Sequence, residues 1–312
     1  DGRTYTFKLK PNVKFHDGSA LTSADVKASY DRIVNPPPGV ISIRKAAYAD
    51  IGAIETPDPS TVVFKLKASN AAMLALFASP WDCIYSAAKL KQDPKFPEKN
   101  ILGTGPFKFA EHVAGSHWVG ERFADYFEPG KPYLDGFRAV FVKGAAMVNA
   151  LQAGDVSFEF RGHSPANRDK LKAALGDKIE VRESPWVCNL VVGFNTEKKP
   201  FDDARVRKAL SLAIDRWQGS QALSKIAFLR GVGGVLRPGY ELAATEAELV
   251  KYPGLSKDIK KSREEAKKLL KEAGVPEGFA FRLHNRAVDQ PYKIAGTWVI
   301  DQWRQIGLNV EQ

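Results

Sequence analysis

The first pattern in the chain is a strict alternation of apolar and polar residues. In DGRTYTFKLK, Tyr5, Phe7 and Leu9 alternate with polar residues, which predicts a β-strand. In AIETPDPSTVVFKLK, two extended runs flank a Pro-Asp-Pro-Ser turn, which predicts a β-hairpin. Shorter apolar runs predict further strands around 107–109, 118–122, 138–142, 157–160, 179–182, 187–194 and 279–284, and the chain ends on another strand, in IGLNVEQ.

Apolar residues spaced three or four apart predict helices between these strands. The helix that follows Thr22 or Ser23 should direct Val26, Tyr30 and Ile33 inward. Other helices are expected at 70–82, at 145–155 with Gly154 as its stop, at 167–175, at 203–217, from Ser262 to Gly274, and from Pro291 to Ile306. Because strands and helices alternate through much of the chain, the sequence predicts an α/β fold.

Two helix starts carry specific capping signals. In VGFNTEKKPFDDARVRKALSLAIDR, Asp202 is expected to cap the helix that follows, and Gly219 is expected to stop it. Ser262 and Glu265 have the spacing of a capping box. The first stretch contains no nucleophile, paired base or metal-binding set, so we interpret it as a structural connection.

The charge of the chain does not by itself indicate a nucleic-acid partner. The 312 residues are 44% hydrophobic and 26% charged, with a formal net charge of +10. In SKDIKKSREEAKKLLKEAG, basic and acidic residues alternate, as on an exposed helix face. No basic block is interleaved with aromatic residues as in a single-strand binder. Nucleic-acid binding is kept as an alternative that steeply salt-dependent retention on DNA or RNA would support.

Cysteine and histidine spacing predicts neither a metal site nor a cofactor. Cys83 and Cys188 are the two cysteines and form no CxxC motif, and the five histidines form no HExxH motif. A disulfide between the two cysteines stays open. No apolar run approaches the length needed to span a membrane.

One motif suggests an enzyme. GHSPA at 162–166 is similar to the GxSxG nucleophile elbow of hydrolases, with Ser164 as the nucleophile. That elbow uses the backbone N–H after the serine as an oxyanion donor, and Pro165 has no N–H. Ala166 also replaces the final glycine. A serine hydrolase is therefore the disfavoured alternative, and a loop at a strand end is the simpler interpretation.

Loops at predicted strand ends supply candidate ligand-binding residues, because such loops line clefts in α/β folds. A tryptophan offers a flat apolar wall, an asparagine both donates and accepts hydrogen bonds, and an arginine can bind a carboxylate in bidentate fashion. The alternatives are a core position for the tryptophan and solvated loop positions for the others. The candidates are Arg161, His163, Trp186, Cys188, Asn189, Asn285 and Arg286.

Several segments in order resemble the family 5 extracellular solute-binding proteins of ABC transporters, the dipeptide, oligopeptide and nickel receptor type. They include TYTFKLKPNVKFHDGSALTSADVKASYDRI, TPDPSTVVFKLK, GTGPFKF, NALQAGDV, GFNTEKKPFDDARVRKALSLAIDR, SREEAKKLLKEAG and DQWRQIGLNVE. Together they extend over essentially the whole chain. One departure is Phe127 in ERFADYF, where the family usually has tryptophan.

The resemblance implies a periplasmic-binding-protein-like type II fold, with two lobes that close about a hinge and an additional lobe of the cluster C type. Mapped on this chain, residues 1–101 form the additional lobe, 102–194 part of the first ligand-binding lobe, and 195–312 most of the second. The stretch GTGPF then marks a crossing between lobes. The family normally has more chain at both ends, so this sequence is expected to be truncated at both ends.

The implied function is that of a non-catalytic, monomeric receptor. It would capture a peptide-like or other small polar solute in the interlobe cleft and deliver it to an ABC permease in the membrane. The implied location is the periplasm, or the extracellular face of the membrane in a Gram-positive host. No cofactor is implied. Trp81, in SPWDC, resembles a family segment that approaches the cleft, with a core position as its alternative. The identity of the solute is open.

Overall fold

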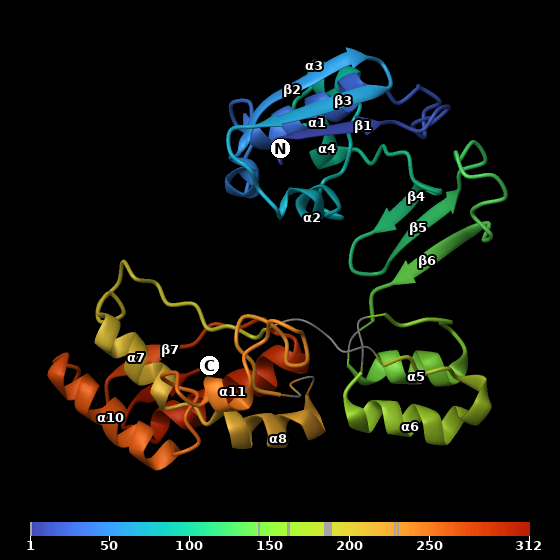
Figure 1. Cartoon of the computed structure of the whole chain (residues 1–312). Coiled ribbons are helices and arrows are strands. Elements are labelled where there is room, and N and C mark those ends of the chain that lie inside the picture. Colours follow the sequence, from blue (N-terminus) through green and yellow to red (C-terminus); the bar gives the residue numbers. More distant parts are fainter. Residues whose placement is uncertain (1, 143, 161–162, 184–188, 228, 230) are drawn as a thin grey trace. The chain divides into compact units, whose positions relative to one another are not determined.

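The computed structural model describes all residues except 1, 143, 161–162, 184–188, 228 and 230 (Figure 1). The chain divides into two compact units, Asp1–Val142 and Lys143–Gln312. They are called the N-terminal and C-terminal units below. Both helices and strands are present, so the predicted mixture of α and β structure is confirmed. The three-part division at 101/102 and 194/195 stays a prediction.

The N-terminal unit contains two antiparallel three-stranded sheets. The first has the order β1-β3-β2 and the second the order β4-β5-β6. The elements are β1 (Thr4–Lys8), α1 (Ser23–Val34), a 3-10 turn (Lys45–Tyr48), β2 (Ile51–Asp58), β3 (Thr61–Leu66), α2 (Met73–Phe77), α3 (Ala87–Gln92), α4 (Phe96–Lys99), β4 (Phe107–Val113), β5 (His117–Arg122) and β6 (Gly136–Val140).

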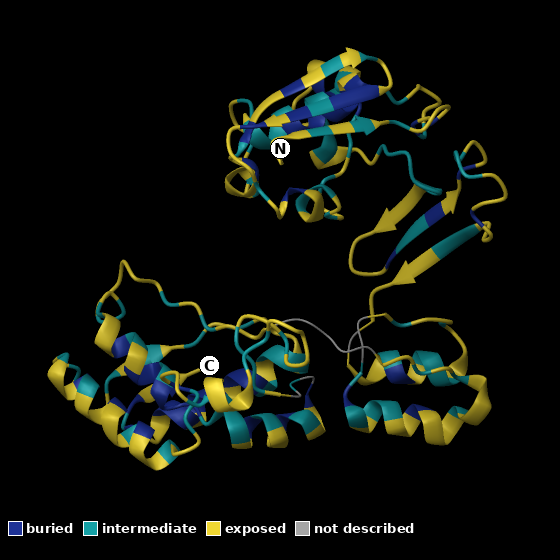
Figure 2. Cartoon of the chain, in the orientation of Figure 1, coloured by how far each residue is buried: buried dark blue, intermediate teal, exposed yellow. Residues whose placement is uncertain are grey.

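The core of the N-terminal unit forms between the first sheet and α1. On the central strand β3, Val62, Phe64 and Leu66 are buried, and Figure 2 shows β3 as the most buried strand of this sheet. Across from them, Val26 and Tyr30 of α1 are buried in the same cluster. The predicted hairpin and the inward face of the helix are therefore confirmed. Thr22 is the N-cap of α1, in a capping box with Asp25.

The loop before α1 is tied to the segments that flank the second sheet. Lys14 Nζ lies 2.7 Å from a carboxylate oxygen of Asp125. Nε2 of the His16 ring lies 3.0 Å from the Gly105 carbonyl oxygen. The same ring makes an edge contact with buried Phe123. These contacts explain why the two sheets belong to one compact unit.

One buried tyrosine in this core should make the stability of the N-terminal unit sensitive to alkaline pH. Burial, reinforced by nearby Asp82 and Tyr48, raises the pKa of Tyr30 well above 10. The folded state therefore keeps this proton at a pH where an unfolded tyrosine loses it, so the stabilisation is complete below about pH 10 and is lost above it. We expect Tyr30→Phe, which retains the ring contacts with Phe64, to lose less stability than the wild type between pH 9 and 11.

Thermal unfolding followed across this pH range measures the difference. Tyr133→Phe is the matched control, because the Tyr133 side chain is exposed in the same unit. Identical alkaline losses in the wild type and in Tyr30→Phe would contradict the assignment.

The C-terminal unit is mainly helical. A two-stranded parallel sheet, β7-β8, lies among its helices. The elements are α5 (Ala145–Ala153), α6 (Pro165–Leu175), a 3-10 turn (Gly176–Lys178), α7 (Ala204–Leu212), α8 (Arg216–Ile226), α9 (Glu246–Leu249), α10 (Ile259–Glu272), β7 (Ala280–Arg282), a π-helical turn (Asp289–Lys293), α11 (Ile294–Arg304) and β8 (Asn309–Glu311). The predicted stop of α5 at Gly154 is confirmed, because this glycine has a φ of 80°.

The core of this unit joins α7, α10, α11 and the parallel strands. Trp303 of α11 is fully buried, and its Nε1 donates a hydrogen bond of 2.9 Å to the Leu210 carbonyl of α7. Val299 and Ile306 are buried in the same cluster, which confirms the predicted inner face of the last helix. Phe194 packs on the cluster, so the segment before α7 belongs to this core.

The capping predictions for α7 and α10 were wrong by a few residues. Asp203, and not Asp202, is the N-cap of α7, and its carboxylate accepts from the Arg205 amide at 2.7 Å. Asp258 caps α10, so Ser262 lies inside the helix and donates to the Asp258 carbonyl. In both cases an aspartate N-terminal to the helix, at the true helix start, provides the cap.

The predicted helix at 203–217 is in fact two helices. The chain leaves helical geometry after α7, and Asp215 caps α8 by accepting from the Gln218 amide at 3.0 Å. Gly219, predicted as a stop, is buried inside α8. A Cβ atom at this position would lie 2.2 Å from the Trp298 ring, so the glycine allows close packing of α8 against α11.

Three predicted strands are not strands in this structure. Segments 157–160 and 179–182, and the described residues 189–194, have no paired partner among the described residues. A strand requires a neighbour to accept its backbone hydrogen bonds, which a local pattern cannot supply. Phe158, Phe160 and Val191 on these segments are 76%, 74% and 79% exposed, although their apolar pattern predicted strands.

Candidate functional site

Trp81 is presented on the surface of the N-terminal unit. Its side chain is 77% exposed, so the alternative of a core position is wrong. It follows α2 in the loop SPWDC, where the next residue, Asp82, has a side chain that is only 1% exposed. The loop thus alternates between an exposed aromatic and a buried carboxylate.

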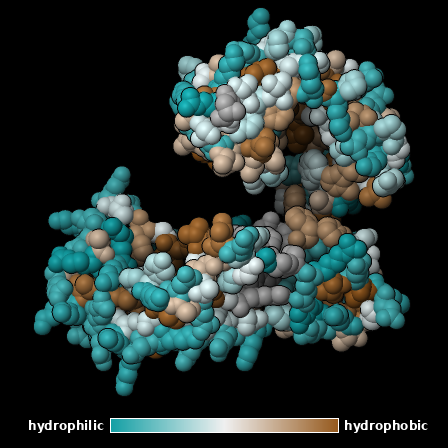
Figure 3. All heavy atoms as spheres, viewed as in Figure 1, coloured by the Kyte–Doolittle hydropathy of each residue, from teal (hydrophilic) through white to brown (hydrophobic). Residues whose placement is uncertain are grey.

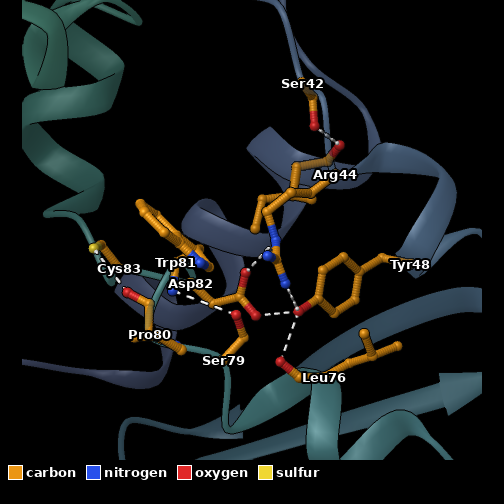
Figure 4. A network of polar contacts seen from close by, with 10 residues as sticks. Ser42, Arg44, Tyr48, Leu76, Ser79, Pro80, Trp81, Asp82 and Cys83 are labelled. Atoms are coloured by element: carbon orange, nitrogen blue, oxygen red, sulfur yellow. Dashed lines mark hydrogen bonds and ion pairs between the residues drawn. The ribbon is translucent and has the colours of Figure 1, made fainter. Parts of the chain in front are cut away.

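A buried polar network holds this loop in place (Figure 4). Arg44 Nε lies 3.1 Å from one carboxylate oxygen of Asp82, Oδ1. The Tyr48 hydroxyl is within hydrogen-bonding reach of the other oxygen, and also 2.8 Å from the Leu76 carbonyl. Arg44 Nη2 donates to the same hydroxyl at 3.2 Å. The network joins the 3-10 turn, α2 and the Trp81 loop.

The network leaves no free charge beneath Trp81. Arg44 and Asp82 neutralise each other, and burial raises the pKa of Tyr48, helped by its hydrogen bond to Asp82. The phenol therefore stays neutral at physiological pH. The chemistry offered at this position comes from the exposed indole, which can pack against an apolar group or a planar group.

Asn285 and Arg286 follow β7 in the C-terminal unit, as predicted. Asn285 Oδ1 accepts a hydrogen bond of 3.0 Å from Gln312 Nε2, and its Nδ2 donates to the Arg286 carbonyl. Arg286 is exposed. Its guanidinium stacks over the Tyr292 ring and donates to the Tyr292 hydroxyl at 3.1 Å. Arg286 makes no carboxylate contact among the described residues, so its guanidinium can accept an anionic partner.

The remaining candidates divide into described and undescribed residues. His163 Nε2 lies 3.6 Å from a carboxylate oxygen of Glu159, and the Asn189 side chain is exposed. Arg161, Trp186 and Cys188 lie outside the described residues. A disulfide between Cys83 and Cys188 therefore stays open. Trp81 lies in one unit and the other described candidates lie in the other, so their convergence on one ligand stays a prediction.

Ser164, the residue of the hydrolase alternative, caps a helix. Its side chain is buried, and its Oγ accepts from the Asn167 amide at 3.3 Å at the start of α6. Pro165 occupies the first helical position, where a missing N–H costs no hydrogen bond. Among the described residues no histidine is hydrogen-bonded to this hydroxyl. The GHSPA sequence is explained as a helix start.

We expect Ser164→Ala to lower the stability of the protein by about 1 kcal/mol through loss of this cap, and to leave solute binding unchanged. Ser164→Asp, which restores a capping oxygen, should recover most of that stability. Denaturant titration and calorimetric binding on the two variants measure both effects. A hydrolytic activity that disappears in both variants would contradict this assignment.

Two surface pockets are lined by none of the candidate ligand-binding residues. One of about 390 Å³ is formed in the C-terminal unit, and one of about 300 Å³ in the N-terminal unit. The first is lined mainly by Lys199, Pro200, Asp202, Val275 and Phe279, and the second by Lys89, Phe96, Lys99, Ile101 and Phe109. In the part of the chain that the structure describes, no group of three metal-ligating side chains could hold an ion.

Sequence reasoning missed the residues that support Trp81. Arg44 and Asp82 lie 38 positions apart, and no local pattern links them. The available signal was that Asp82 lies in a short loop beside apolar residues, where a carboxylate needs a partner. Separately, no helix within the described residues is long and apolar enough to cross a bilayer.

Comparisons with known proteins agree with this fold. The model of the family described as bacterial extracellular solute-binding proteins, family 5 Middle, matches residues 1–312. The glutathione-binding protein GsiB of Pectobacterium atrosepticum is 34% identical over 318 residues, covering 100% of this chain and 58% of that protein. The chain therefore spans little more than half the length of this relative.

Two solved structures are similar over nearly the whole chain. The PBP AgaA from A. tumefaciens R10, in complex with agropinic acid, has a TM-score of 0.77 and 31% identity, covering 99% of this chain and 60% of that one. The oligopeptide-binding protein AppA from Bacillus subtilis, in complex with a nonapeptide, has a TM-score of 0.73 and 26% identity, covering 99% of this chain and 62% of that one.

Proposed function

Because this chain belongs to the family 5 bacterial extracellular solute-binding proteins, we propose that the protein is the solute receptor of an ABC importer. The observation that carries the proposal is the family match over residues 1–312. The solute is a peptide-like molecule or another small polar molecule. One relative is named for glutathione, and two others are described in complex with agropinic acid and with a nonapeptide, all molecules that contain carboxylates or amides.

The described candidate residues suit such a solute. The exposed Trp81 indole can cover a flat or apolar part of it. Arg286 can bind a carboxylate in bidentate fashion, and Asn189 can pair with an amide or hydroxyl group. In the mechanism that the family implies, a solute that contacts both lobes only in the closed state stabilises that state.

In its closed form, the receptor then docks on the non-cytoplasmic side of a membrane permease. This partner and the periplasmic or extracellular location follow from the family and form part of the proposal. No step requires a cofactor or covalent chemistry. The solute should therefore be recovered unchanged after release.

Calorimetric titration of the full-length protein tests this function. The probes are glutathione, agropinic acid and a short peptide mixture, and at least one should bind. Trp81→Ala should weaken binding about tenfold or more, since indole contacts in ligand sites carry large shares of affinity. Tyr133 is an 82% exposed aromatic residue of the same unit and is not a ligand-binding candidate. Tyr133→Ala should therefore leave the affinity unchanged. Equal affinities in both variants, or recovery of a hydrolysed probe, would contradict the proposal.

A further inference from the structure

Arg286 and Tyr292 form a stacked pair in the segment between β7 and α11. Arg286 Cζ lies over the Tyr292 ring, 4.8 Å from its centroid. Nη1 of the same guanidinium donates a hydrogen bond of 3.1 Å to the Tyr292 hydroxyl. Figure 3 shows hydrophilic side chains over much of the visible surface, so the exposure of one arginine says little about its role. The two contacts are more informative, because together they orient the guanidinium.

The backbone that carries Arg286 is tied to the end of the neighbouring strand. β7 and β8 are parallel, so the chain leaves both strands at the same edge of the sheet. Asn285 Nδ2 donates to the Arg286 carbonyl at 2.8 Å, and Asn285 Oδ1 accepts from Gln312 Nε2 at 3.0 Å. Gln312 Nε2 also donates to the Lys293 carbonyl at 2.9 Å. The loop is therefore held at the residue before Arg286 and at the residue after Tyr292.

A glycine in the first turn of α11 makes room for these hydrogen bonds. Gly296 is buried. A Cβ atom at this position would lie 2.7 Å from Gln312 Nε2 and 3.0 Å from Asn285 Oδ1, closer than ordinary van der Waals contact. The absence of a side chain at Gly296 thus allows the contact between Asn285 and Gln312. Loop, strand end and helix start form one local arrangement around Arg286.

This arrangement leaves one edge of the guanidinium unused. Arg286 donates no other side-chain hydrogen bond to a described residue. Asp289 is the one carboxylate in residues 283–293, and it forms no ion pair with Arg286. Nε and Nη2 of Arg286 therefore remain as a parallel pair of donors, the geometry that binds both oxygens of a carboxylate. A carboxylate that lies along this edge leaves the stack on Tyr292 intact.

We infer that Tyr292 is a positioning residue, which orients Arg286 so that the receptor prefers solutes that carry a carboxylate. This inference rests on the proposed receptor function and adds to it the charge of the solute and the residue that aligns the guanidinium. Arg286 contacts the carboxylate, and Tyr292 acts through Arg286. Without the stack and the hydroxyl contact, the long arginine side chain would lose more rotamer freedom on binding, which weakens the bidentate contact.

Calorimetric titration of the full-length protein tests the inference. Glutathione, agropinic acid and trialanine are each compared with the same molecule whose carboxylates have been converted to amides. At least one of the acids should bind about tenfold more tightly than its amide, because the amide cannot form the charge-assisted pair of hydrogen bonds. In Arg286→Gln this preference should fall below about twofold, because the guanidinium is absent.

Two substitutions test Tyr292 itself. Tyr292→Phe keeps the ring and removes the hydroxyl, and it should lower the preference to about threefold. Tyr292→Leu removes both contacts and should lower the preference to that of Arg286→Gln. Affinity for the amide should stay within about twofold of the wild type, whereas a purely structural role of Tyr292 would weaken acid and amide alike. Tyr252→Phe, at a 59% exposed tyrosine of the same unit, is the matched control and should keep the full preference.

A double-mutant cycle separates this inference from the function on which it rests. Adding Tyr292→Phe to Arg286→Gln should cause no further loss of preference, since the two residues act as a unit. Additive losses, an unchanged preference in both Tyr292 variants, or a wild type that binds acid and amide equally would overturn the inference and leave the receptor function standing. A wild type that binds none of the acids and none of the amides would count against both.

Discussion

Trp303→Ala should destabilise the C-terminal unit by about 3–5 kcal/mol, the cost of truncating a large buried aromatic. Trp303 is fully buried where α7, α11 and the parallel strands meet. The substitution removes its packing and also leaves the Leu210 carbonyl without the 2.9 Å hydrogen bond from the indole. Urea unfolding of the full-length protein, followed by circular dichroism, measures the change.

Trp81→Ala is the matched control for this substitution. The Trp81 side chain is 77% exposed, so its removal should change the free energy of unfolding by less than about 0.5 kcal/mol. The two tryptophans thus separate stability from solute binding. A destabilisation by Trp81→Ala as large as that by Trp303→Ala would contradict the burial on which both assignments rest.

Gly254→Ala should destabilise the same unit by about 2–4 kcal/mol. Gly254 has a φ of 80°, and a Cβ atom there would lie 2.5 Å from Ser211 Oγ and 3.0 Å from both the Ser211 carbonyl oxygen and Arg216 Nη1. The Gly254 carbonyl also accepts a 2.6 Å hydrogen bond from the half-buried Arg216 guanidinium, which has no carboxylate partner among the described residues. Alanine would strain the backbone and displace this contact.

Gly278→Ala isolates the contribution of backbone strain. Gly278 has a φ of 75°, but nothing lies within 4 Å of a Cβ atom at this position. The substitution Gly278→Ala should therefore lower the free energy of unfolding by only about 1 kcal/mol, the penalty of an alanine in the left-handed conformation. Denaturant titrations of both variants give the difference. Equal costs would show that the contacts around Arg216 contribute no stability.

Local sequence signals predicted the elements whose cause is local. The alternation of Tyr5, Phe7 and Leu9, the turn at Pro59 and the helix stop at Gly154 each depend on neighbouring residues, and each is present in the structure. The break between α7 and α8 depends instead on Asp215 and on the packing of Gly219 against Trp298, a partner far along the chain. A helical pattern alone could not reveal it.

The candidate site shows the same limit. Trp81 was identified through the family resemblance, but its support could not be, because the Arg44–Asp82 contact joins residues from separate segments.

Native mass spectrometry of the full-length protein, purified under mild conditions and then denatured to release its contents, tests the receptor function most directly. The account predicts one discrete small molecule per protein, released unchanged on unfolding. A protein that remains empty in repeated preparations, and whose unfolding temperature no small solute raises in a broad screen, would contradict the account.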